Sequence, residues 1–174
     1  MEKYRFIFFL PKTAFSAMNV EKGNIVRRAS NWIEVDTKTD NLDVGFSFAS
    51  GSCIEEVCVF RTGERESEKD LNPEDGFKLI EEEKYWLGHE FFEKFWRGTS
   101  GEISSFFHCL VLICVSMVHF QMGNKDNSER LFRQAIEDLS RLGVKELENQ
   151  NFSYPLSSNV ISALKRMAKD LVTV

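Results

Sequence analysis

The sequence predicts an α+β protein in which a small β-containing domain precedes a mostly antiparallel four-helix bundle. Short segments rich in aromatic and β-branched residues, typical of strands, lie in the first third of the chain. Apolar residues at helical spacing, punctuated by glycines, fill the second half. Between these regions, residues 61–84 hold nine acidic and five basic side chains. We therefore predict a β-rich (α+β) domain over 1–62, an acidic connector over 63–76 and a helical bundle over 77–174.

Extended segments dominate the prediction for the N-terminal domain. Tyr4–Leu10 combines aromatic and β-branched residues, and residues 31–36 and 42–48 alternate apolar with polar side chains. The turn residues Asp40-Asn41 join the latter two segments into a predicted hairpin. Residues 54–60 fit either a further strand or a short helix, because the pattern of so short an apolar run does not distinguish them.

Four helices are predicted in the C-terminal domain, over residues 77–97, 101–122 and 126–142, and from Ser157 or Ser158 onward. Thr99 and Glu102 match a capping box for the second helix. That helix is apolar almost all round, so we place it at the centre of the bundle. Its apolar run, Phe106–Phe120, is shorter than the roughly 20 residues of a bilayer span, and we interpret it as a buried helix.

Composition narrows the classes of function. With 43% hydrophobic residues and sixteen Phe among 174, the chain is globular rather than disordered. A net charge of −5 argues against a nucleic-acid partner, because binding phosphates needs a basic face. The apolar stretch within residues 1–12 is too short for a signal peptide. We therefore expect a cytoplasmic protein with reduced cysteines and no membrane partner.

One motif on the first predicted helix, His89 to Trp96, combines titratable and aromatic side chains. A stripe about 60° wide, at 100° per residue, holds Tyr85, His89, Phe92 and Trp96. Glu93 lies one turn beyond His89, so the two side chains can meet. The helix therefore carries an imidazole and a carboxylate on or beside an aromatic face.

One interpretation of this motif is a metal-dependent hydrolase. His89 and Glu93 can share a divalent Zn, Fe or Mn ion, with Glu90 as the general base. An antiparallel second helix brings His108 to the same level as a third ligand. The zincin pattern H-E-x-x-H is not matched, because Glu93 replaces the second histidine.

The other interpretation, which we favour, is a structural network of His89, Glu93 and Trp96 in a protein that is not an enzyme. Glu93 would then accept a hydrogen bond from His89 or from the neighbouring helix, and Trp96 would pack in the core. The many phenylalanines exceed what a small bundle needs. We expect the excess to be buried between the two domains or in an interface with a second copy or another protein.

The motif His89-Glu90-x-x-Glu93-x-x-Trp96, followed by an apolar helix and the turn Gly123-Asn124, closely resembles the domain-of-unknown-function 309 family. The resemblance covers about residues 77–142 and implies an all-helical bundle, with His89, Glu90, Glu93 and Trp96 as signature positions. Members of this family are sometimes labelled predicted metal-dependent hydrolases. The second helix departs from the family's Gln-Gly-Leu-Ile-Gln pattern, since it reads His-Cys-Leu-Val-Leu from His108.

The remaining candidate groups are predicted to be structural. Cys109 and Cys114 are five residues apart and point in different directions on a helix, so we expect them to pack as small hydrophobic residues. The basic pairs Arg27-Arg28 and Lys165-Arg166 are predicted to lie on the solvated surface.

Overall fold

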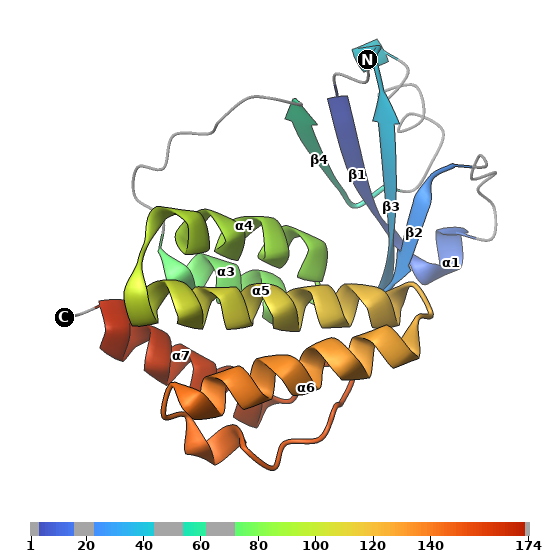
Figure 1. The fold of residues 1–174 in the computed structure, drawn as a ribbon. Helices are drawn as coiled ribbons and strands as arrows, with labels where there is room; N and C mark the ends of the chain where they lie inside the picture. The colour runs from blue at the N-terminus through green and yellow to red at the C-terminus, as the bar shows by residue number, and fades with distance from the viewer. Residues whose placement is uncertain (1–3, 16–22, 44–53, 62–71, 173–174) are drawn as a thin grey trace. The chain divides into compact units, whose positions relative to one another are not determined.

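The computed structural model describes residues 4–15, 23–43, 54–61 and 72–172. The chain divides into two compact units, residues 1–67 and 68–174 (Figure 1). The first unit holds an antiparallel sheet and the second is helical, which confirms the predicted α+β class.

The described part of the sheet unit contains four strands and one short helix. Their bounds are β1 Tyr4–Pro11, α1 Lys12–Phe15, β2 Ile25–Arg28, β3 Trp32–Thr39 and β4 Glu56–Arg61. The strand order is β2-β3-β1-β4, and every neighbouring pair is antiparallel. The first strand is therefore a central one, and its side chains are buried on both faces from Phe6 to Leu10.

Alternation of side chains along the strands separates an apolar face from one that carries both charged and apolar side chains, since Ile7 and Phe9 lie opposite Asp36 and Glu34. On the apolar face a buried cluster forms from Phe6, Phe8, Leu10, Ile33 and Val35. On the other face a cluster of four charged side chains, the charged quartet, consists of Arg5, Arg27, Glu34 and Asp36.

The charged quartet joins β1, β2 and β3. Asp36 accepts hydrogen bonds from Arg5 Nε at 2.9 Å and from Arg27 Nη2 at 2.8 Å, and Arg27 also donates to Glu34. Arg27 is only 1% exposed, and Glu34 and Asp36 are each 2% exposed. The prediction of a solvated Arg27 is therefore wrong. Arg27 lies directly opposite Glu34 in the register of β2 with β3, and β2 itself was not predicted.

The other strand predictions have mixed outcomes. The segment Tyr4–Leu10 forms a strand, and residues 54–60 take the strand alternative as β4. Residues 31–36 lie within β3 except for the first of them, but the described partners of β3 are β1 and β2. Most of the predicted hairpin partner, residues 42–48, lies outside the described part of the chain.

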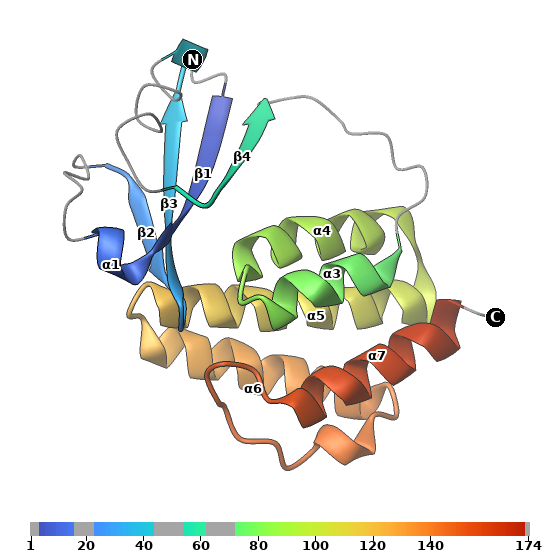
Figure 2. The ribbon, with the colours of Figure 1, turned by 180° about the vertical axis from the view of Figure 1, so that it is seen from behind.

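The helical unit holds five described α-helices and a 3₁₀ helix: α3 Pro73–Glu81, α4 Tyr85–Gly98, α5 Gly101–Gln121, α6 Lys125–Arg141, η1 Lys145–Leu147 and α7 Ser158–Val172. Helices α4, α5 and α6 form a layer, seen from its open side in Figure 1. Helices α3 and α7 lie on the opposite side of that layer, which faces the viewer in Figure 2.

The predicted first helix, residues 77–97, is in fact two helices. Helix α3 begins at Pro73, inside the predicted connector, where the Asn72 side chain accepts a hydrogen bond from Glu74 N. The chain leaves the helix after Glu81, and Glu83 has a φ of 57°. Gln121 Nε2 donates to the Glu83 carbonyl at 3.0 Å and Tyr154 Oη donates to its carboxylate at 2.6 Å. These tertiary hydrogen bonds stabilise the break between α3 and α4, where the sequence has neither a proline nor a glycine.

Helix α5 is the core helix of this unit, as predicted. Eleven of its residues are buried, and it packs between α4 and α6. By length and composition alone it would also be able to cross a membrane. The predicted capping box is wrong, because Ser100 is the N-cap residue and Thr99 Oγ1 instead donates to the Phe95 carbonyl.

Candidate functional site

The motif residues lie on α4, on the side that borders α5. Within the predicted stripe, Tyr85 and Phe92 are fully buried, whereas His89 and Trp96 are half-buried. Phe92 packs edge-on against Phe77 of α3, with ring centroids 5.4 Å apart. Two residues of the stripe therefore belong to the core, and the other two, His89 among them, lie at its edge.

His89 lies against an aromatic ring and close to an acidic neighbour. Its imidazole centroid is 4.9 Å from that of Trp86, with the planes tilted by 36°. Its Nδ1 is 3.8 Å from an oxygen of Glu90, whose side chain is 40% exposed. The side chain of His89 itself is 16% exposed, so the half-buried imidazole lies beside a more exposed carboxylate.

Glu93 does not hydrogen-bond to His89, contrary to the structural interpretation of the motif. Its carboxylate instead accepts a hydrogen bond from Arg97 Nη2 at 2.7 Å, one turn further along α4. The Arg97 side chain is 72% exposed, so this is a surface ion pair of the i, i+4 kind.

Trp96 and His108 join α4 to α5. Their ring centroids are 4.5 Å apart, and Ser104 of α5 donates to the Trp96 carbonyl at 3.1 Å. Further along α5, Leu112 and Val115 follow His108 on the same side of the helix and are also half-buried. We call the surface made by Trp86, His89, Trp96, His108, Leu112 and Val115 the α4–α5 face.

The predicted metal ligands do not assemble. Glu93 is engaged by Arg97 and the His108 ring packs on Trp96, so neither is placed with His89 around a common point. Within the described residues, no group of three or more His, Cys, Asp or Glu side chains is arranged to hold a metal ion. Glu90 was predicted to act as the general base of such a site, and its side chain is 40% exposed and lies beside His89.

The described cysteines of the helical unit are packed in its core. Burial raises the pKa of Cys109 to about 12 and that of Cys114 further still. Because the thiolate is the nucleophilic and metal-binding form, both thiols are inert at neutral pH. Cys114 also packs closely against α4, with its Sγ 3.3 Å from where a Cβ on Gly88 would lie.

Replacing Glu93 with alanine is expected to lower the free energy of unfolding by only about 0.5 kcal/mol. The ion pair with Arg97 is exposed and lies within one helix, and such pairs contribute a few tenths of a kcal/mol. Urea unfolding of the Glu93→Ala and Arg97→Ala variants measures the effect. A loss of about 2 kcal/mol or more for Glu93→Ala alone would mean that the carboxylate has a second, buried role.

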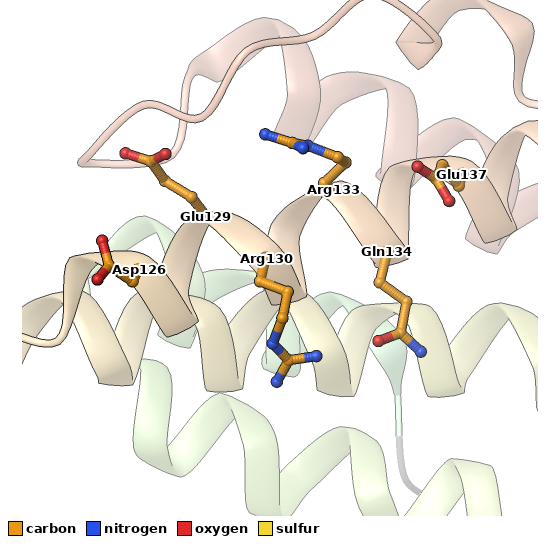
Figure 3. Close-up of a pocket in the computed structure, with 6 residues that line it drawn as sticks. All are labelled: Asp126, Glu129, Arg130, Arg133, Gln134 and Glu137. Atoms are coloured by element: carbon orange, nitrogen blue, oxygen red, sulfur yellow. The ribbon is translucent and has the colours of Figure 1, made fainter.

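A hollow on α6 was not anticipated from the sequence. It has a volume of about 440 Å³ and is lined by side chains of that helix alone: Asp126, Glu129, Arg130, Arg133, Gln134 and Glu137. In Figure 3, Glu129 and Arg133 point to one side of the helix and Arg130 and Gln134 to the other. The sequence signal was the polar face of an amphipathic helix, which is too common a pattern to indicate a site.

Comparison with known proteins identifies one family. Residues 74–131 match the model of the family described as Domain of unknown function (DUF309). The match confirms the resemblance predicted from the motif, and it extends from the first turn of α3 into α6. No curated protein and no solved structure matches the chain.

Proposed function

We propose that residues 74–131, the DUF309 segment of this chain, belong to a non-enzymatic interaction module in which two copies associate through the α4–α5 face. The observation that carries the proposal is the pair of tryptophan–histidine contacts, Trp86–His89 and Trp96–His108, held half-buried on this face. His89 packs on Trp86 of the same helix, Trp96 packs on His108 of α5, and Glu93 is paired with Arg97, which supports a structural role for the motif.

The composition of the α4–α5 face is typical of the centre of a protein interface. Tryptophan is among the residues most enriched at positions that dominate binding energy, and it is rigid enough to lose little entropy when covered. Leu112 and Val115 extend the apolar area between the two ring pairs. None of the six side chains in this face carries a permanent charge, so covering it requires little desolvation of ions.

The rim of the face favours a second copy over an unrelated partner. Glu93 and Arg97 lie one turn apart on α4 and carry opposite charges. In a two-fold interface the same patch meets itself in the opposite direction, so an acidic position on one copy can face a basic position on the other. The charge pattern of this rim is therefore compatible with self-association.

The test is the oligomeric state across a concentration series, measured by light scattering after size-exclusion chromatography. The unchanged protein is expected to be a dimer at micromolar concentration, and Leu112→Arg is expected to be a monomer because it places a charge in the centre of the face. Ser162→Arg adds the same charge at an exposed position of α7, away from the α4–α5 face, and this variant is expected to remain dimeric.

Two results would overturn the proposal. One is a monomer at every concentration; the other is equal dissociation by Leu112→Arg and Ser162→Arg, with thermal melts showing that both variants fold. Near-stoichiometric Zn, Fe or Mn in protein purified without chelator, lost in His89→Ala, would instead support the hydrolase interpretation.

A further inference from the structure

A second hollow lies between α6 and the chain that follows η1, and it has a volume of about 610 Å³. Its floor is apolar, because Phe132 and Ile136 are buried and Phe152 packs edge-on against Phe132 with centroids 5.6 Å apart. We call it the amide groove, after the three consecutive amide side chains on one wall, Asn149, Gln150 and Asn151. Its size is within the range of sites that bind small ligands.

Most of the polar side chains that line the amide groove form no hydrogen bond or ion pair with the described part of the chain. Among the described residues, none of the three side-chain amides has a hydrogen-bonding partner, and Glu129, Arg133 and Glu137 make no ion pair. Glu148 alone is engaged, accepting a hydrogen bond from Ser140 Oγ at 2.5 Å. Some exposed charges of the same unit are paired, by contrast, as in Arg166 with Glu146.

We propose that the amide groove binds a short extended peptide segment carrying lysine or arginine. Each Asn or Gln amide offers a donor and an acceptor, which is what an extended backbone needs from a neighbour. Three carboxylates against one guanidinium give the lining a net charge of −2, which selects a cationic segment.

The length of the groove fits such a ligand. From Glu129 to Glu137 the wall runs eight residues along α6, or about 12 Å at 1.5 Å per residue. An extended chain advances about 3.3 Å per residue, so three or four residues span that wall. The partner is therefore a linear motif or a chain terminus rather than the surface of a folded domain.

Titration of the ¹⁵N-labelled full chain with a capped Ala-Lys-Ala-Lys-Ala peptide, followed by NMR, tests the proposal. Saturable shifts are expected in the side-chain amide signals of Asn149, Gln150 and Asn151, and a capped Ala-Glu-Ala-Glu-Ala peptide should give none. Glu137→Lys is expected to weaken binding of the lysine peptide about tenfold. Glu102→Lys, an equal charge change at the exposed start of α5, should alter it less than about twofold.

Three outcomes would overturn the proposal. The first is the absence of saturable shifts, and the second is equal weakening by Glu137→Lys and Glu102→Lys. The third is binding of spermidine as tight as that of the lysine peptide, which would show attraction of any cation without recognition of a backbone. Leu112→Arg leaves this groove intact, so peptide binding by that variant separates this proposal from self-association.

Discussion

Asp36→Asn is expected to destabilise the sheet unit by about 3 kcal/mol. The Asp36 carboxylate accepts hydrogen bonds from both Arg5 and Arg27, and removing one partner from a buried ion pair costs about 3–5 kcal/mol. We take the lower end of that range because Arg27 keeps Glu34 and an asparagine oxygen can still accept one bond. Amide hydrogen exchange in peptides from β1 and β3, read by mass spectrometry, measures the change within this unit.

Glu34→Gln is the matched variant, and a much smaller loss of about 1 kcal/mol is expected. Burial raises the pKa of Glu34 despite the neighbouring Arg27, so keeping this carboxylate ionised opposes folding. For Asp36, burial also raises the pKa, but hydrogen bonds from Arg5 and Arg27 outweigh it and the net pKa is lowered. Equal losses in the two variants would contradict this asymmetry.

The stabilities of Asp36→Asn and Glu34→Gln should also depend differently on pH. The lowered pKa of Asp36 means that its contribution is present above the unfolded value of about 3.9 and is lost as the pH falls through the folded pKa. The raised pKa of Glu34 acts in reverse, because stability declines as the pH rises from about 4.3 through the folded value. Asp36→Asn should therefore flatten the acid side of the stability profile, and Glu34→Gln the part above a pH of about 4.3.

Gly76→Ala should destabilise the helical unit by about 1–3 kcal/mol, against the usual trend for a helix. Alanine is normally about 1 kcal/mol better than glycine inside a helix. A Cβ on Gly76 would lie 2.6 Å from ring atoms of both Phe91 and Phe92. Phe92 is fully buried and cannot move aside without disturbing the core, so the steric term is expected to prevail.

Gly98→Ala, at the last residue of α4, is the control. Nothing lies within 4 Å of the position that the added methyl group would take, so we expect an effect between zero and a gain of about 1 kcal/mol. Urea midpoints at an unchanged slope measure both variants. If Gly76→Ala were as stable as the unchanged protein, α3 would have to pack more loosely on α4 than the structure shows.

The sequence was sufficient to predict elements whose signals are local. The apolar periodicity of α5 and α6 and the strand composition of β1 predicted these elements to within a few residues. The break at Glu83 was missed because it depends on Gln121 and Tyr154, which are distant in sequence. Arg27 was misjudged for the same reason, since its burial depends on pairing of β2 with β3.

The candidate site shows a similar division. Helical spacing placed His108 of the second predicted helix beside the first, because two antiparallel helices joined by a short turn have a predictable register. The ring that His108 contacts is that of Trp96, however, and not a site shared with His89 and Glu93. Spacing did not predict that Glu93 would pair with Arg97, because both His89 and Arg97 lie within one helical turn of the Glu93 carboxylate. The amide groove could not be predicted from the sequence for a further reason. Its two walls come from different segments of the chain, and neither segment carries a recognisable motif.

The central position of β1 affects how the sheet unit can fold during synthesis. Residues 4–11 leave the ribosome well before their partner strands, which begin only at Trp32 and Glu56. Until those strands emerge, a segment that is apolar on both faces has both edges unpaired, which is a common starting point for aggregation. Helices α4, α5 and α6, by contrast, pack on neighbours adjacent in sequence and can assemble rapidly. Within the sheet unit, the strand that is made first is thus fully paired only once β4 has emerged.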